Sequence, residues 1–542
     1  MNRIRTIGPA VVMVALLTSI GEAGETADVE GLWADPVLVS TNQASREASI
    51  ALSPIDPNLM AICGPSGVPN IPNNQSYFHR SKNGGKTWSF MQVEAAQTDT
   101  RRYAFEGGDC DVAFDAAGTM YSADTWLADL SIGHSTDGGD TWTGTALAAT
   151  SPIVDRPWLV GGPAGTIHVT YQDLQCCTPS AMWYTRSTDY GQTFLPAVPI
   201  TAAGPDGAYT WEGNFVVSPN GQDLYLVYTR RNTNNLVTGL DQSGPETVWV
   251  AASHNAGLTW TSHLVASMPN PASYLYPSIA MDAGGHLHVV FASKTDTDRP
   301  VWYAFSKDQA ETWSAPLAIS RGGSGFSPWV AGGRAGEAAI TWYGSPTPMA
   351  GLSDPVDWYF YAARVRDAHT GSPLVTSQAT TPAPIFTGSS SIPEFEMLRL
   401  DQDGRMHLGM AAFRRVGASN RFVFYYQREL LPKVEGTGAA GGATFDLSVE
   451  RDGDQAGGAL SLVDGEVTVT ALSVEDVQLE KVANGVACSV TGEARVTAGG
   501  VETMEPFTAT CLDASSGSDE LTVQTSSFTG GGTVTDGALT AG

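Results

Sequence analysis

The sequence is poor in charged residues, and above all in basic ones. Only 16% of its 542 residues are charged, and 29 Lys and Arg stand against 56 Asp and Glu, for a net charge of −27. Phosphate backbones and anionic lipid surfaces are bound through clustered Lys and Arg. The composition therefore argues against nucleic acid and anionic membranes as partners. A structural calcium ion is compatible with so acidic a chain.

Long apolar segments are absent as well. An apolar run from about Val11 to Leu17 follows a basic start and precedes a small-residue site at residues 21–23, which is the pattern of a secretory signal peptide. The run is too short to cross about 30 Å of hydrocarbon, which disfavours the alternative of a membrane anchor. We expect residues 1–23 to be cleaved after about Ala23, and the mature chain to be a secreted monomer without membrane insertion.

Cysteine is scarce, with six residues, and in an exported chain such cysteines favour disulfides. Cys488 and Cys511 stand alone in the C-terminal segment, so we expect them to pair. The sequence leaves open how the other four pair, namely Cys63, Cys110, Cys176 and Cys177. Because no CxxC or His/Cys spacing indicates zinc, we expect no metal site and no cofactor.

Glycine, in contrast, is abundant, and one string with glycine at its centre recurs. Ser-x-Asp/Asn-x-Gly-x-Thr-Trp stands at residues 81–88 and 135–142, and softer copies end at Phe194, Trp260 and Trp313. The Asp or Asn accepts backbone N–H bonds across a turn, glycine supplies a positive φ, and the aromatic residue packs between strands. Five such hairpin turns, called Asp boxes, predict a β-propeller.

A second repeat counts the blades. An apolar first strand occurs in seven copies, which begin near Ser49, Asp111, Trp158, Asn214, Ser278, Trp329 and Met397. Seven first strands predict a seven-bladed propeller over residues 34–432. The last unit lacks a fourth strand, and the segment Pro36–Ser40 has no blade of its own. We expect that segment to complete blade seven and to close the ring.

The composition changes after about Val434. The small residues 436–442 are typical of a linker, and alternating runs at residues 460–463 and 466–470 predict strands. No Lys or Arg follows Arg495. We expect residues 440–542 to form a small, acidic β-sandwich that serves either in glycan binding and adhesion or in structure and sorting.

The Asp boxes resemble those of the sialidase superfamily. The resemblance implies a propeller, with the six blades of true sialidases as the alternative to seven. Arg46-Glu47-Ala48-Ser49-Ile50 is similar to the family segment whose Arg binds the substrate carboxylate. Glu212 with Arg230 is similar to the unit that supplies a base and a second clamp arginine, and Tyr276-Pro277-Ser278-Ile279 to the blade with the nucleophilic tyrosine.

The chemistry of this family explains why such residue types are needed. A tyrosine with a pKa near 10 requires an adjacent carboxylate to attack as phenolate, and planar guanidinium groups bind a carboxylate bidentately. The resemblance therefore implies that Glu212 activates Tyr276. Asp109 or Asp155 would serve as the general acid, and Arg156 would be the third clamp arginine.

Residues at the starts of the seven first strands converge on one face of the channel, where we expect the ligand site. Five of the seven aligned positions are ionisable. The seven aligned positions are Glu47, Asp109, Arg156, Glu212, Tyr276, Ser327 and Phe395, and they are flanked by Arg46, Asp155 and Glu394. Trp158 and Trp329 stand at strand starts, where they are candidates to stack on a sugar.

Three functions follow from these residues. The first is a secreted glycoside hydrolase of sialidase type, acting on terminal acidic sugars of extracellular carbohydrate or glycoprotein. The second is a non-catalytic propeller that binds glycan or protein. The third is a lyase of uronate-containing polysaccharide, with His288 and Tyr276 as its proton-transferring pair. We otherwise interpret His168, His286, His288 and His407 as structural residues of second strands.

Overall fold

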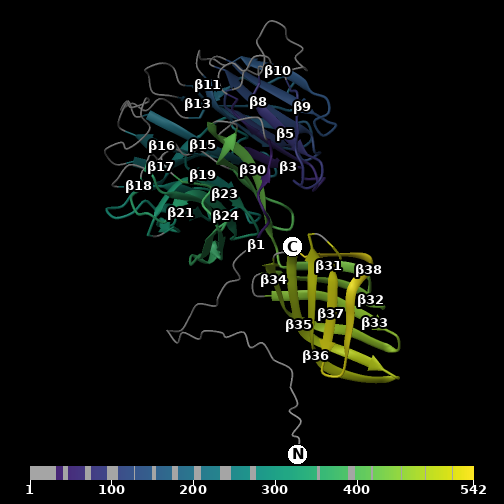
Figure 1. Cartoon of the computed structure of the whole chain (residues 1–542). Helices are drawn as coiled ribbons and strands as arrows, with labels where there is room; N and C mark the ends of the chain where they lie inside the picture. The colour runs from purple at the N-terminus through teal and green to yellow at the C-terminus, as the bar shows by residue number, and fades with distance from the viewer. Residues whose placement is uncertain are drawn as a thin grey trace, which may run out of the picture.

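The computed structural model shows an all-β chain. It describes residues 32–541 except the segments 41–46, 67–74, 94–107, 127–128, 149–153, 174–180, 201–208, 232–245, 269–275, 321, 351–353, 388–396, 417–418, 453–454, 483 and 516. Seven antiparallel sheets form seven blades, and the first strands of the blades contact one another in sequence order and then close from the seventh back to the first (Figure 1). Seven blades are confirmed, and the six-bladed alternative is excluded.

The first four blades each consist of four strands. Blade 1 is β3 (Ser49–Leu52), β4 (Met60–Gly64), β5 (Tyr77–Ser81) and β6 (Ser89–Phe90). Blade 2 is β7 (Cys110–Phe114), β8 (Met120–Trp126), β9 (Asp129–Ser135) and β10 (Thr143–Ala148). Blade 3 is β11 (Val154–Gly161), β12 (Ile167–Asp173), β13 (Ala181–Ser187) and β14 (Val198–Pro199). Blade 4 is β15 (Tyr209–Val217), β16 (Leu224–Arg231), β17 (Glu246–Ser253) and β18 (Thr261–Met268).

The last three blades include the strands that finish the ring. Blade 5 is β19 (Ser278–Met281), β20 (Leu287–Ala292), β21 (Val301–Ser306) and β22 (Leu317–Ala318). Blade 6 is β23 (Ser324–Gly332), β24 (Ala338–Ser345), β25 (Asp357–Arg366) and β26 (Leu374–Ala379), with the short β27 (Phe386–Thr387) beside β25. Blade 7 is β28 (Leu398–Leu400), β29 (Met406–Val416) and β30 (Ser419–Leu430), joined by β1 (Leu32–Trp33) and β2 (Val37–Leu38).

Blade 7 is completed by the other end of the propeller sequence, as the spare strand predicts. β2 pairs antiparallel with β30, so that Val37 faces Tyr426 and Leu38 faces Tyr425. β1 extends the same edge, with Trp33 opposite Glu429. This closure covers the edge of β30 that the missing fourth strand would otherwise leave unpaired.

All five Asp boxes form the predicted hairpin turn. In blade 2, the Ser135 hydroxyl accepts the Gly139 N–H at 2.8 Å, and the Asp137 carboxylate accepts the Thr141 N–H at 2.9 Å. The Trp142 indole N–H donates to the Gly139 carbonyl at 3.2 Å. The serine and Asp/Asn bonds recur in blades 1, 3, 4 and 5. The indole bond recurs in blades 1, 4 and 5, whereas the box of blade 3 ends in Phe194. The boxes are thus structural turns.

Each of two boxes also packs on the blade before it. A Cβ built at Gly257 of blade 4 would lie 2.0 Å from the Tyr184 ring of blade 3, and one at Gly85 of blade 1 would lie 2.0 Å from the Tyr426 ring of blade 7. The box tryptophan adds a ring contact, since Trp260 lies 5.7 Å from Tyr184 between ring centroids. The central glycine is therefore needed both for its positive φ and for this close approach.

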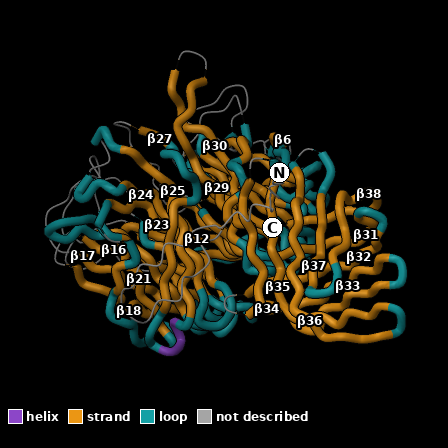
Figure 2. The backbone as a smooth tube through the Cα atoms, turned by 60° about the horizontal axis from the view of Figure 1, so that its bottom comes forward, coloured by secondary structure: helices purple, strands orange, loops and turns teal. Residues whose placement is uncertain are grey.

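The C-terminal domain is a closed eight-stranded barrel. It comprises β31 (Lys433–Ala440), β32 (Ala443–Asp452), β33 (Gln455–Asp464), β34 (Val467–Val482), β35 (Gly485–Ala498), β36 (Val501–Ala514), β37 (Glu520–Thr525) and β38 (Thr529–Ala541). The barrel stands beside the propeller (Figure 2). The predicted β-sandwich is corrected here, because pairing of β31 with β38 joins the first strand to the last and leaves no second sheet to pack.

The expected linker at residues 436–442 is also wrong, because most of it is strand β31. Its small residues permit close packing where the barrel closes. A Cβ at Gly438 would lie 2.0 Å from the Asp536 carbonyl oxygen of β38. Glycine therefore marks a tight strand pair at this place and not a flexible segment.

Two disulfides cross-link the described residues. Cys488 of β35 is bonded to Cys511 of β36 inside the barrel domain, and Cys63 of β4 is bonded to Cys110 of β7 between blades 1 and 2. Cys176 and Cys177 lie outside the described residues. Among the described residues, no helix has the length and apolar character needed to cross a membrane.

The contact between Gly257 and Tyr184 can be separated from the effect of positive φ alone. Gly257→Ala and Gly221→Ala both place alanine at positive φ, but the Cβ at Gly221 meets nothing within 4 Å. Gly221→Ala should lower the free energy of unfolding by about 1–2 kcal/mol, because alanine is strained in the left-handed conformation. Gly257→Ala should lower it by about 1–3 kcal/mol more, because its Cβ also overpacks against Tyr184. Urea unfolding of both variants measures the difference, and equal costs would contradict the packing role.

Candidate functional site

The first strands begin with irregular backbone at the mouth of the channel. The pairing of first and second strands is interrupted by bulges in blades 3, 4 and 6. Glu47, Arg156 and Ser327 occupy aligned positions and have positive φ angles of 61°, 53° and 50°. Non-glycine residues in this conformation carry strain, which commonly marks functional positions, and bulges re-aim side chains. The backbone thus singles out the same positions as the sequence.

Arg156 lies at the centre of this face. Its Nε is 3.7 Å from Oδ2 of Asp109 in blade 2 and 3.9 Å from Oδ2 of the adjacent Asp155. Its Cζ is 4.3 Å from the centre of the Tyr276 ring of blade 5, a cation–π contact. Arg156 therefore connects side chains from three blades.

Glu212 of blade 4 completes the group. Its side chain is fully buried, and its backbone N–H donates to Oε1 of Gln172 at 3.5 Å. Burial raises the pKa of Glu212 well above its ordinary value, and the Asp155 carboxylate adds to the rise, whereas Thr170 and the Arg156 guanidinium oppose it. We call Asp109, Asp155, Arg156, Glu212 and Tyr276 the channel cluster.

Access to the channel cluster is through its aspartates. Arg156, Glu212 and Tyr276 are only 8%, 0% and 2% exposed. The side chains of Asp109 and Asp155 are 16% and 25% exposed. A ligand that approaches along the described surface therefore meets the two carboxylates first.

Trp158 and Trp329 close the channel beneath the cluster. Their rings come from blades 3 and 6 and lie 5.4 Å apart between centroids, and both are buried. Each therefore packs against the other tryptophan, with the two ring planes tilted by 48°. The proposed stacking on a sugar would require this pair to separate.

A second cavity, of about 400 Å³, lies on the other side of the tryptophan pair. Asp111 and Arg399 face it, and burial raises the pKa of Asp111 to about 6, while Arg399 opposes the rise. Asp111 has a structural role, because its carboxylate accepts hydrogen bonds from the Ser49 hydroxyl and, at 2.7 Å, from the Leu159 N–H.

Several predicted residues lie away from the cluster or outside the described residues. Arg230 lies on the second strand of blade 4, where its Cζ is 5.7 Å from the Trp249 ring of the third strand. Glu47 is half-buried at the start of blade 1. Arg46, Glu394 and Phe395 lie outside the described residues. The three-arginine clamp thus shows one member, Arg156, within the channel cluster.

The histidines of the second strands form a repeated structural network. The Nδ1 atoms of His168, His288 and His407 each lie 2.7 Å from a tyrosine hydroxyl of the third strand in their blade. His288 Nε2 also lies 3.2 Å from Asp282. Both ring nitrogens of His288 are therefore occupied, and its expected pairing with Tyr276 as a lyase base is wrong.

Two polar residues near the cluster were missed from the sequence. Thr170 and Gln172 interrupt the apolar second strand of blade 3, and this interruption was the available signal. The segment between Asn58 and Asp109 contains one aspartate, Asp99, where the sialidase family has its general acid. Asp99 lies outside the described residues.

No group of three or more His, Cys, Asp or Glu side chains capable of holding a metal occurs in the described part of the chain. In the channel cluster, the acidic side chains lie around the Arg156 guanidinium. Carboxyl groups beside a guanidinium can exchange protons with polar groups of a ligand and form hydrogen bonds to them.

The fold and these repeats agree with a comparison to protein families. The profile of the BNR repeat-like domain matches residues 18–289, which is half of the chain. The chain belongs to this BNR repeat-like family. No curated protein is significantly similar in sequence.

Solved structures similar to this BNR protein include three carbohydrate-active proteins. They are a GH93 α-L-arabinofuranosidase of Fusarium graminearum (15% identity, TM-score 0.40, 73% of this chain and 97% of that one), a PL25 ulvan lyase (11%, 0.42, 73% and 94%) and a leech intramolecular trans-sialidase (12%, 0.39, 74% and 70%). Identities and TM-scores this low transfer no activity.

The raised pKa of Glu212 predicts that Glu212→Gln increases the stability of the protein in a pH-dependent way. A carboxyl with a folded pKa above its unfolded value stabilises the fold below the unfolded pKa, and that contribution is lost as pH rises through the folded pKa. The urea midpoint of the variant, relative to wild type, should therefore rise from about pH 4 upward.

The exposed Glu520 of the barrel supplies the control for this measurement. Glu520→Gln should shift the midpoint by a similar small amount at every pH. If the difference between Glu212→Gln and wild type stays constant between about pH 4 and pH 8, the buried carboxyl does not control this pH dependence.

Proposed function

We propose that this protein is a secreted, sialidase-like glycoside hydrolase that acts on terminal acidic sugars of extracellular glycans at the channel cluster. The observation that carries the proposal is the contact of Arg156 with Tyr276 and two aspartates beside the buried Glu212. The cluster unites a phenol, three carboxyl groups and a guanidinium from four blades. These are the residue types that a tyrosine-dependent retaining hydrolase requires.

The proposed roles follow from the position of each group. Glu212 takes the phenolic proton as Tyr276 Oη attacks the anomeric carbon, and the bond to the leaving oxygen breaks. Asp109 or Asp155 gives that oxygen a proton, because these carboxyls are the accessible ones. Water then attacks the anomeric carbon and gives its proton to the aspartate that acted as acid. The bond to Tyr276 breaks, Glu212 returns the proton to the phenolate, and the sugar is released. Arg156 offers a planar cation to the sugar carboxylate.

The raised pKa of Glu212 suits the task of a base. A carboxylate in a water-poor site accepts a proton more readily than an exposed one, and its pKa moves closer to that of the phenol. The cation–π contact places the positive charge of Arg156 beside the proposed nucleophile.

Tyr276→Phe should abolish turnover of a fluorogenic sialoside, with a loss of at least about 10²-fold, and leave folding intact. The Tyr276 hydroxyl is the proposed nucleophile, whereas the ring that contacts Arg156 remains. Initial rates measure the loss, and circular dichroism checks the fold. Unchanged turnover in this variant would rule out Tyr276 as nucleophile.

The exposed Tyr190 of an Asp-box turn provides the matched control. Tyr190 follows the third strand of blade 3, whereas Asp155 and Arg156 lie on the first. Tyr190→Phe therefore removes a hydroxyl from a different part of the blade and should leave turnover unchanged. Wild-type inactivity on sialosides and on a panel of aryl glycosides would instead favour a binding role.

A non-catalytic glycan-binding propeller is the second candidate. The low exposure of Arg156, Glu212 and Tyr276 favours it, because a reacting group has to touch its substrate. Binding of sialosides without turnover, weakened by Tyr276→Phe only slightly, would support this function over hydrolysis. An unsaturated product from uronate polysaccharide, detected by its ultraviolet absorbance, would instead indicate a lyase with a base other than His288.

A further inference from the structure

A cavity of about 580 Å³ lies between blades 6 and 7 and the barrel. Its walls come from the β23–β24 turn, the strands β25 and β26, the β28–β29 turn and the start of the barrel. The volume falls within the range of about 300–1,000 Å³ typical of small-molecule sites. The cavity shares no residue with the channel cluster.

Basic side chains are concentrated in this cavity. The whole chain has 29 basic residues against 56 acidic ones, whereas the cavity lining has equal numbers. The basic residues are Arg334, Arg364, Arg366, Lys433 and Arg451, and the acidic ones are Glu337, Asp401, Asp403, Glu429 and Glu450. In so acidic a protein, this is a place where an anion meets little repulsion.

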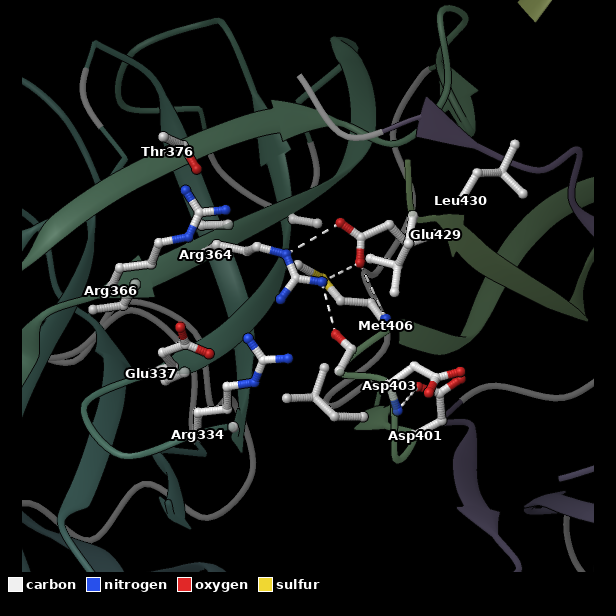
Figure 3. Close-up of a pocket in the computed structure, with 18 of the residues that line it drawn as sticks. Arg334, Glu337, Arg364, Arg366, Thr376, Asp401, Asp403, Met406, Glu429 and Leu430 are labelled. Atoms are coloured by element: carbon white, nitrogen blue, oxygen red, sulfur yellow. Dashed lines mark hydrogen bonds and ion pairs between the residues drawn. The ribbon is translucent and has the colours of Figure 1, made fainter. Parts of the chain in front are cut away.

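Arg364 is held in a fixed orientation at the centre. Its Nε lies 3.2 Å from Oε1 of Glu429, its Nη2 bonds to Oε2 of the same carboxylate, and Nη2 also donates to the Gly404 carbonyl at 2.8 Å. Figure 3 shows the head groups of Arg334 and Arg364 both turned toward the middle of the cavity. Because Nε and Nη2 of Arg364 bond to Glu429 and Gly404, its Nη1 is the nitrogen left for a ligand, and beside Arg334 it suits an anionic group such as a carboxylate.

Trp33 adds a second, independent feature. Its side chain is 8% exposed and lines the cavity, and its Nε1–H has no hydrogen-bond partner among the described residues. A buried donor without a partner is rare in native structures. Because Trp33 forms part of the cavity wall, a ligand oxygen that comes within reach of Nε1 would accept this hydrogen bond.

We propose that this cavity binds an acidic saccharide, a sugar unit that carries a carboxylate, as a glycan site separate from the channel. Arg334 and Arg364 hold the carboxylate, and the Trp33 N–H donates to a ring substituent. Glu337 and Asp403 accept hydroxyl protons, and Leu430 and Leu479 supply apolar contact for the ring. The mixture of donors, acceptors and apolar wall fits a sugar better than a simple inorganic anion.

Trigalacturonate is the test ligand, with calorimetry on the full chain as the measurement. Wild type should bind it, and maltotriose, a neutral trisaccharide, should bind at least tenfold more weakly. Binding should weaken as salt is added, because the anion is held by charge. Arg334→Ala should weaken trigalacturonate binding at least tenfold, and Trp33→Phe, which keeps an aromatic ring but lacks the N–H, severalfold.

Two controls separate this site from other causes. Arg495→Ala removes an equal charge from an exposed place on the barrel and should leave the affinity unchanged. Tyr276→Phe should also leave it unchanged, so that failure of hydrolysis in the channel and failure of this site are told apart.

Four outcomes would overturn the proposal. They are absence of trigalacturonate binding, equal affinity for maltotriose, full affinity in both Arg334→Ala and Trp33→Phe, and binding of sulfate alone at the same arginine. Where Arg334→Ala unfolds, Trp33→Phe still decides.

Discussion

The propeller depends on polar side chains near its axis that form hydrogen bonds between neighbouring blades. The Asp111 carboxylate of blade 2 accepts the Ser49 hydroxyl of blade 1 and the Leu159 N–H of blade 3. Asn214 of blade 4 exchanges two hydrogen bonds with Ile279 of blade 5, at 2.8 and 2.9 Å. These residues occupy aligned positions two or three places after the channel mouth. The same bonds between neighbouring blades therefore hold the residues of the channel cluster in position.

Blades 3 and 6 depart from this rule, and the site follows from the departure. At the aligned position, blades 1, 2, 4 and 5 carry polar side chains and blade 7 carries Met397. Blades 3 and 6 carry Trp158 and Trp329, which meet across the axis. The pair divides the channel into an upper part with Glu212 and a lower cavity with Asp111. Exclusion of water on either side disfavours the charged form of a carboxyl, which is why the pKa values of both Glu212 and Asp111 are raised.

The sequence predicted the features that recur and missed those that depend on distant pairing. The Asp boxes, the seven first strands and the closing strand β2 are local patterns, and the structure confirms each. The barrel was mistaken for a sandwich because its closure rests on β31 and β38, almost 100 residues apart. In the site, alignment of repeats brought together Asp109, Arg156, Glu212 and Tyr276. It did not show that Asp109 of blade 2 faces Arg156 of blade 3, since ion pairs between blades leave no periodic signal.

The residues with strained backbone connect the packing of the channel with the position of the cluster side chains. Arg156 and Ser327 both adopt positive φ within bulges, and each is followed by proline and then by the paired tryptophan. Such a conformation costs about 1–3 kcal/mol and persists only where the surroundings impose it. The bulge turns the tryptophan across the axis, and in blade 3 the same turn aims Arg156 at Tyr276 and the aspartates. Packing of the channel thus supplies the energy that holds Arg156 in place. In blade 6 the same backbone geometry presents Ser327. Blades 3 and 6 therefore share a backbone scaffold, but only blade 3 places a charged side chain at this position.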